Sequence, residues 1–216
     1  TPLGLTYSDG KLSWQEVIES VNGQTYVCDN YELTLTQGED VTVISNIVTN
    51  SYSMQSAGTF TATVRAVGGA NFTPSEQSES YTFSAVFGVE DVNYDKETSK
   101  LSWEDAKNTA NTTYRVVKNG VYLDSVITKG EQNSFEVALP LSGGESLSIQ
   151  VVATVDKFSA KSELLKFSML DAVEIKVENG EITWDRVIGA ESYEVFVENV
   201  STGTSTSEVV TETSYS

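Results

Sequence analysis

The chain has 216 residues, 39% of them hydrophobic, which is enough to form packed cores and argues against wholesale disorder. Its 31 acidic and 13 basic residues give a formal net charge of −18, and a field of that sign repels nucleic acid and anionic membrane surfaces. We therefore expect no nucleic-acid partner and, since no apolar run is long enough to span a bilayer, no membrane insertion. The single cysteine excludes an internal disulfide, and the lack of histidine removes the commonest general base.

The first third of the chain combines an early tryptophan, a later tyrosine and strand-like alternation. Trp14 ends the segment Gly-Lys-Leu-Ser-Trp, and Tyr26 opens an apolar-alternating run that we expect to be the next core strand. Residues 59–67 alternate with a period of two, which predicts a strand with one face in a core and one in water. Residues 75–79 are expected to form the last strand of this set.

The same order of features returns twice further along the chain. The second set consists of Trp103, Tyr114, the Asn119-Gly120 turn, the alternating run 146–153 and a last strand at 159–163. The third set consists of the Asn179-Gly180 turn, Trp184, Tyr193 and the alternating run 192–198. Asn119-Gly120 lies between two apolar runs, which is a strong hairpin signal, and Asn179-Gly180 marks a further turn. The repeat is as long as a domain, because solenoid units have only about 20–50 residues.

Placing the three sets in register predicts three domains, at residues 1–86, 87–170 and 171–216. Short strands, frequent turns and the lack of a long amphipathic segment are typical of antiparallel β-sandwiches. The expected fold class is therefore all-β, with tandem immunoglobulin-like sandwiches. Only residues 87–88 and 170–171 separate successive copies, and linkers this short predict an elongated, monomeric rod.

The third copy stops early. Its last residues, 213–216, match residues 50–53 of the first copy, so its final two strands are missing. We expect the core around Trp184 to be open and one sheet edge to be unpaired. Three explanations are left open: a truncated fragment, a chain clipped by a protease, or strand exchange with another chain or copy.

These features resemble the fibronectin type III family, in the divergent form common in secreted and surface proteins of bacteria. The resemblance covers nearly the whole chain and is carried by the tryptophans, the tyrosines and the Val-x-Ala pairs at 64–66 and 151–153. It implies fibronectin type III-like sandwiches of seven strands, two complete and one incomplete. The family usually has a tyrosine on the penultimate strand, where this chain has Phe60 and Leu147, which carry no hydroxyl for the family's hydrogen bond.

The residues that first suggest chemistry have structural interpretations. Cys28 lies two residues after Tyr26, in the position of Val116 and Val195, so we expect it to face the core rather than to act as a reactive thiol. The recurrence of the tryptophans at one register likewise predicts core residues rather than a surface for ligand stacking.

Two further groups are candidates for binding. Tyr31 and Tyr122 share no register between copies, so they are better suited to an exposed sugar-stacking surface, although covering a sheet edge also explains them. Acidic residues gather around the first boundary and in one loop: Glu90, Asp91, Asp95 and Glu97, and Glu39 with Asp40. One interpretation is an interdomain calcium ion, and the other is solvated acids, since the sequence has no Asp-x-Asp-x-Asp-Gly loop.

No sequence pattern points to catalysis, a cofactor or a metal site, because a Gly-x-Ser-x-Gly, a phosphate-binding glycine loop and a zinc pattern are all lacking. We therefore predict no enzyme but a structural spacer or interaction array in a larger secreted or cell-surface bacterial protein, extracellular or attached to the cell wall. The sequence does not start with a basic and apolar signal segment. This start is expected either of a cytosolic chain or of a mature or trimmed fragment. The first alternative is a module that binds a glycan or host protein through edge strands or loops. The second is an accessory region of a carbohydrate-active enzyme.

Overall fold

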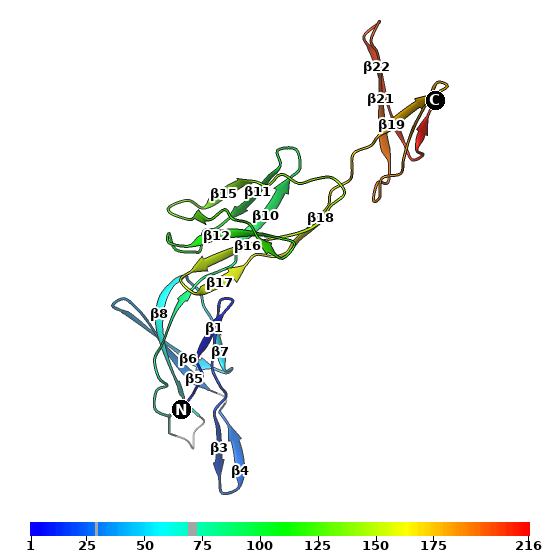
Figure 1. The fold of residues 1–216 in the computed structure, drawn as a ribbon. Helices are drawn as coiled ribbons and strands as arrows, with labels where there is room; N and C mark the ends of the chain where they lie inside the picture. Colours follow the sequence, from blue (N-terminus) through cyan, green and yellow to red (C-terminus); the bar gives the residue numbers. More distant parts are fainter. Residues whose placement is uncertain (29, 69–72) are drawn as a thin grey trace. The chain divides into compact units, whose positions relative to one another are not determined.

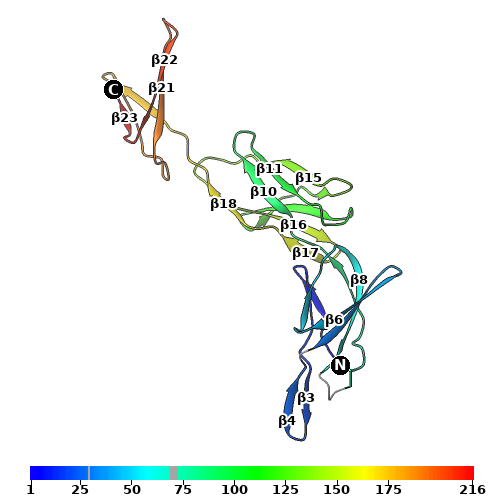
Figure 2. The same ribbon diagram turned by 180° about the vertical axis from the view of Figure 1, so that it is seen from behind.

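The computed structural model describes residues 1–28, 30–68 and 73–216, and these residues form strands, turns and loops (Figures 1 and 2). They fall into two compact units, residues 1–138 with 149–165 and residues 139–148 with 166–216. Among the described residues there is no helix with the length and apolarity needed to cross a bilayer.

The first sandwich consists of a three-stranded and a four-stranded antiparallel sheet (Figure 1). The first sheet has the order β1-β2-β7, with β1 (Thr6–Ser8), β2 (Lys11–Ser13) and β7 (Ser51–Ser53). The second has the order β6-β5-β8-β9, with β5 (Tyr31–Gln37), β6 (Asp40–Ile47), β8 (Gly58–Ala66) and β9 (Tyr81–Ala85). Between β2 and β5 the chain forms a separate hairpin of β3 (Ile18–Val21) and β4 (Gln24–Val27).

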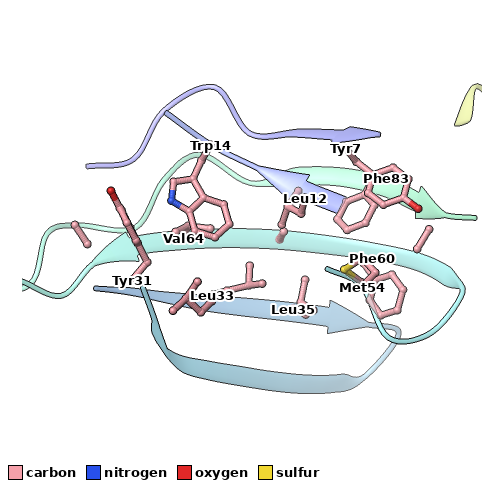
Figure 3. Packing of buried hydrophobic residues seen from close by; sticks show 14 of the residues in the cluster. Tyr7, Leu12, Trp14, Tyr31, Leu33, Leu35, Met54, Phe60, Val64 and Phe83 are labelled. Carbon is pink, nitrogen blue, oxygen red and sulfur yellow. The ribbon is translucent and has the colours of Figure 1, made fainter. Parts of the chain in front are cut away.

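The core of the first sandwich lies between its two sheets (Figure 3). The alternation predicted for residues 59–67 is confirmed, because every second residue of β8 from Phe60 onward is buried. Figure 3 shows Leu12 and Trp14 pointing from the first sheet toward Leu33 and Val64 of the second. Burying one large apolar side chain of this kind stabilises a fold by about 1.5–3 kcal/mol.

The second sandwich repeats this strand order. Its first sheet is β10-β11-β15, with β10 (Glu90–Asp95), β11 (Lys100–Glu104) and β15 (Ser134–Ala138). Its second sheet is β13-β12-β16-β17, with β12 (Thr113–Lys118), β13 (Val121–Tyr122), β16 (Ser146–Val155) and β17 (Phe158–Lys161). Two short strands extend it, β14 (Ile127–Thr128) on β12 and β18 (Leu165–Ser168) on β16. The Asn119-Gly120 hairpin is confirmed, with φ angles of +49° and +80° that suit a type I′ turn.

The third set of strands contains the first sheet and half of the second. The sheet β19-β20-β23 consists of β19 (Ile175–Glu178), β20 (Glu181–Trp184) and β23 (Ser214–Tyr215). The hairpin consists of β21 (Tyr193–Asn199) and β22 (Thr204–Val210). Tyr215 lies opposite Ile182 as Tyr52 lies opposite Leu12 in the first sandwich, which confirms the alignment of the two segments.

One predicted strand is wrong. Residues 75–79 do not form a strand, although residues 158–161 form β17 where a last strand was expected. The hydroxyl of Ser78 accepts a hydrogen bond from the Val64 N–H (3.0 Å), a donor that a regular strand would satisfy with its backbone. Ser162 makes the same bond to the Val151 N–H (3.0 Å), directly after β17. In both copies, the serine hydroxyl therefore takes the place of a backbone carbonyl as the acceptor for the valine N–H of the neighbouring strand.

The fold is thus all-β, built from tandem antiparallel β-sandwiches of the immunoglobulin and fibronectin type III kind. The two sheets of each sandwich follow the same strand order in the first and second copies.

Candidate interaction surfaces

Each tryptophan packs edge-on against a tyrosine of the facing sheet. The pairs are Trp14–Tyr31, Trp103–Tyr114 and Trp184–Tyr193, with ring centroids 5.4, 5.7 and 5.3 Å apart and interplanar angles of 68°, 69° and 64°. All three tryptophans are buried, so their prediction as core residues is confirmed.

The structure corrects the register of the first copy. Tyr31 is the partner of Trp14 and is 1% exposed, whereas Tyr26 is 39% exposed on β4. The Tyr31 hydroxyl accepts a hydrogen bond from the Val17 N–H (3.1 Å), as the Tyr193 hydroxyl does from the Val187 N–H (3.0 Å). The expectation of Tyr31 as an exposed residue is therefore wrong, because the β3–β4 hairpin is inserted ahead of the core strand.

The corrected register also changes the position assigned to Cys28. The position equivalent to Val116 and Val195 belongs to Leu33, which is fully buried two residues after Tyr31. Cys28 instead lies half-buried at the margin of the first core, as a free thiol whose Sγ donates a hydrogen bond to the Asn30 carbonyl (3.1 Å). The prediction that Cys28 occupies the core-strand position of Val116 and Val195 is therefore wrong, and its side chain packs only partly against the core.

Tyr122 is exposed, as the sequence predicts for a candidate stacking residue. The guanidinium carbon of Arg115 lies 4.8 Å from the centre of its ring, a cation–π contact. Arg115 also donates a hydrogen bond to the Leu123 carbonyl (3.0 Å), which fixes it in this place. One face of the Tyr122 ring is therefore occupied by the protein itself.

A buried carboxylate organises the start of the second sandwich. Asp105 accepts hydrogen bonds from the backbone N–H groups of Lys107 and Asn108 (both 2.9 Å), from Asn108 Nδ2 (2.7 Å) and from the Tyr114 hydroxyl (2.5 Å). Burial alone would raise the pKa of Asp105, but these hydrogen bonds outweigh it and hold the pKa below its ordinary value. Burial and the bond to Asp105 raise the pKa of Tyr114, which therefore stays a donor.

The chain is held on both sides where the first sandwich ends and the second begins. The Tyr7 hydroxyl donates to the Val86 carbonyl and accepts from the Val86 N–H, both at 2.9 Å. The Asn108 side chain does the same to the next residue, accepting from the Phe87 N–H (2.7 Å) and donating to its carbonyl (2.8 Å). We call residues 86–88 the junction. The N–H and the carbonyl of Val86 are thus bonded to the first sandwich, and those of Phe87 to the second.

Close packing adds to these bonds at the junction. A Cβ atom on Gly88 would lie 2.2 Å from the Lys161 carbonyl oxygen, so only glycine fits there. The ring of Phe158, on β17, contacts the ring of Tyr7 edge-on at a centroid distance of 5.7 Å. The first and second sandwiches therefore share a packed boundary within one compact unit.

The acidic residues near this boundary have local partners. Glu90 forms an ion pair with Lys107. Asp95 accepts hydrogen bonds from the Thr98 hydroxyl (2.7 Å) and the Glu97 N–H (2.8 Å), and the Thr98 bond is the main cause of its lowered pKa. Within residues 1–28, 30–68 and 73–216, no group of three or more candidate ligands is arranged to hold a metal ion.

The β3–β4 hairpin presents apolar side chains to solvent. Ile18, Tyr26 and Val27 are all exposed on its two strands. The Asn22-Gly23 turn has φ angles of +53° and +77°, so it too is of type I′. The described part of the other two copies has no such hairpin between the tryptophan and the core tyrosine, and this surface belongs to the first copy alone.

The third set of strands leaves an apolar groove open, as predicted. The groove has a volume of about 420 Å³, and its lining includes Ile182, Trp184, Tyr193 and Val195. Equivalent positions in the three copies differ in exposure. They are the residues that lie opposite Leu12, Leu101 and Ile182 in the first sheet, namely Tyr7, Tyr94 and Val177, respectively. The first two are 7% and 9% exposed, whereas Val177 is 64% exposed.

No protein-family model and no curated protein matches the chain. Similar solved structures include two fibronectin type III domains of chicken tenascin, 15% identical, covering 77% of this chain and 97% of that one with a TM-score of 0.36. The chicken interferon gamma receptor alpha chain is 11% identical, covering 78% and 97%, with a TM-score of 0.38. A BSP domain of a biofilm-associated protein is 12% identical over 78% of this chain, with a TM-score of 0.30, and the match spans only 29% of that longer chain.

Proposed function

We propose that the chain is a non-catalytic array of sandwich modules that acts as a structural spacer in a larger secreted or cell-surface bacterial protein, extracellular or attached to the cell wall. The observation that supports this most is the junction, where Val86 and Phe87 are held by Tyr7 and Asn108. A rigid spacer keeps its modules at a fixed angle. A hinge needs backbone torsions that can change, and here each change would break hydrogen bonds worth about 1 kcal/mol apiece.

Residual dipolar couplings measured by NMR test this proposal. If the junction is stiff, the first and second sandwiches share one alignment tensor in the wild-type chain. Asn108→Ala, which removes both bonds to Phe87, is expected to separate the two tensors. Ser134→Ala is the matched control, because it removes an exposed hydrogen bond of the second sandwich, to Glu104, far in sequence from the junction. Two independent tensors in the wild type would contradict a spacer role.

A specific observation favours a second candidate function, adhesion to a glycan or host protein. The β3–β4 hairpin carries three exposed apolar residues, and exposed apolar patches often mark interaction sites. Ile18→Ser with Tyr26→Ser is expected to abolish retention on a glycan array or host-cell surface. Val41→Ser, at another exposed apolar residue, is the control and leaves retention unchanged. Adhesion has no support if the wild type is not retained either.

A further inference from the structure

The second sandwich has a groove on one side, between the edges of its two sheets. The groove lies between β10, an outer strand of the first sheet, and residues 163–165, where the chain passes from β17 to β18 of the second. We call residues 89–92 and 163–165 the side groove. Its volume is about 280 Å³, and its apolar lining includes Val89, Val92, Leu164 and Leu165. Space of this size and polarity suits a long side chain with an apolar stem.

Strand irregularities frame the side groove on both sides. β10 has a bulge between positions 90 and 93, where Asp91 has a φ of +52° in the left-handed region. On the other side, the Ser162 hydroxyl is the acceptor for the Val151 N–H just before the chain enters the groove. Bulges turn a strand edge away from regular pairing and are frequent beside functional sites. The two edges therefore leave room for a side chain rather than for another strand.

The first sandwich has an equivalent groove that carries less charge. Gly4 and Asp91 each lie three positions before the matched tyrosine of β1 or β10, and their φ angles are +65° and +52°. The equivalent groove has a volume of about 220 Å³ and lies between residues 2–5 and 78–81, with Glu79 as the one carboxylate among its described lining residues. The geometry therefore recurs in both complete copies, whereas the carboxylates gather in the second.

Three carboxylates line the side groove, those of Glu90, Asp91 and Glu163. Lys107 forms an ion pair with Glu90, so the molecule itself contains an example of a lysine ammonium held at this place. Among the residues that the structure describes, Asp91 and Glu163 form no ion pair, and both are exposed. Two negative charges beside an apolar groove are complementary to a further cationic side chain with an apolar stem.

From this geometry and charge, we propose that the side groove binds a lysine side chain on an extended segment of another, basic protein. The methylene stem of the lysine packs against the valines and leucines, and its ammonium lies between the carboxylates of Asp91 and Glu163. A second copy of this chain is a poor partner, because two chains with a formal net charge of −18 each repel one another. The interaction is independent of the spacer role, since it needs only the side groove of the second sandwich.

The test uses the 216-residue chain and, as the probe, the peptide Ala-Val-Lys-Val-Ala with blocked ends. NMR titration of the labelled chain both locates the binding and gives the affinity. Saturable shifts are expected for the amide signals of residues 89–92 and 163–165, with little change at residues 2–5 and 78–81. Norleucine in place of the lysine keeps the apolar stem without the ammonium, and it is expected to weaken binding about fivefold, as for exposed ion pairs.

Variants of the chain provide the matched comparison. Asp91→Asn with Glu163→Gln removes both charges, and it should weaken binding of the lysine peptide about fivefold but leave binding of the norleucine peptide unchanged. Asparagine tolerates the left-handed conformation and both positions are exposed, so this variant is expected to fold normally. Glu79→Gln is the control, because Glu79 follows Ser78 as Glu163 follows Ser162, and it should change neither affinity.

Four outcomes would overturn the proposal. The first is the lack of any shift in the side groove at millimolar lysine peptide, and the second is equal affinity for the lysine and norleucine peptides. The third is an equal shift in the equivalent groove of the first sandwich, because the carboxylates would then have no part in recognition. The fourth is a change of the side-groove signals with protein concentration alone, which would assign the groove to a second copy. None of these outcomes affects the shared alignment tensor that tests the spacer role.

Discussion

The first sandwich and residues 171–216 share their tryptophan–tyrosine packing but differ in what covers the opposite face. The Trp14–Tyr31 and Trp184–Tyr193 ring geometries are nearly the same, and each tyrosine hydroxyl bonds a valine N–H. Yet Tyr7 is covered by Phe83 of β9, at a centroid distance of 4.7 Å, while its counterpart Val177 is bare. The comparison teaches that the aromatic pair has the same geometry whether or not the facing sheet position is covered.

The largest expected effect comes from breaking the aromatic pair in a closed and in an open copy. Trp103→Ala should cost about 3–5 kcal/mol, since it leaves a cavity in a closed core. Trp184→Ala should cost less than half as much, because its core is already open to the groove. Amide hydrogen exchange in β11 and β20 measures the two local stabilities. Equal costs would show that the open copy is as well packed as the closed one.

The next effect concerns Asp105, whose bond to the core tyrosine has no carboxylate counterpart in the described residues of the other copies. Asp105→Ala should cost about 3 kcal/mol, because it leaves buried donors of Tyr114 and Asn108 unpaired. The pKa of Asp105 is lowered in the folded state, so its contribution is complete above its unfolded pKa of about 3.9 and is lost as the pH falls through the folded pKa.

Urea unfolding followed by circular dichroism between pH 7 and pH 2 checks both points. Wild type should lose stability in acid more steeply than Asp105→Ala. Parallel acid profiles for the two proteins would argue against the assigned charge state.

A smaller effect is expected from added bulk at the junction. Gly88→Ala should cost about 1–3 kcal/mol, as overpacking does, because its Cβ meets a backbone oxygen at 2.2 Å. Gly143→Ala is a graded comparison, since its Cβ would lie 2.9 Å from the Leu170 carbonyl oxygen, and it should cost less. Thermal unfolding measured by calorimetry gives both values. A larger loss of stability in Gly143→Ala than in Gly88→Ala would mean that the backbone near Lys161 shifts easily to make room for the added Cβ.

The smallest effect is expected from removal of one hydroxyl. Tyr7→Phe should cost about 1–2 kcal/mol, because it leaves both backbone groups of Val86 without the bonds they make to the tyrosine. Tyr52→Phe, on β7 of the same sandwich, serves as the control and should be near neutral. The same calorimetry applies, and equal losses in both variants would assign no special role to the Tyr7 bonds.

Much of the fold follows from local sequence patterns. The period-two runs at 59–67 and 146–153 and the Asn-Gly turns depend on residues close together in the chain, and the structure confirms them. The run at 192–198 forms a strand, but Val195 is its one buried residue, so the alternation of burial predicted there is not observed. The three predicted domain boundaries stay predictions.

The main error arose from an insertion. Tyr26 begins an alternating run just as a core tyrosine does, so the β3–β4 hairpin imitates the expected strand. The run Tyr-Glu-Leu-Thr-Leu at 31–35 matches Tyr-Glu-Val-Phe-Val at 193–197 more closely, and it is the signal that would have placed Tyr31 correctly.

The bonds at the junction had no such signal. Tyr7 and Val86 are 79 positions apart, and Asn108 reaches back 21 positions to Phe87. Contacts between residues so distant in sequence depend on how completed sandwiches meet, which periodicity and turn chemistry do not encode.

The position of Tyr7 has a consequence for how the protein is made. A ribosome releases the N-terminal residues first, so Tyr7 emerges long before Val86, its partner, has been synthesised. The first sandwich must wait for nearly its whole length before its terminal strand is secured, and Phe87 must wait longer still for Asn108. During that interval the nascent chain exposes the face of β1 that later carries Phe83 and Phe158, and this is when we expect chaperones to bind it.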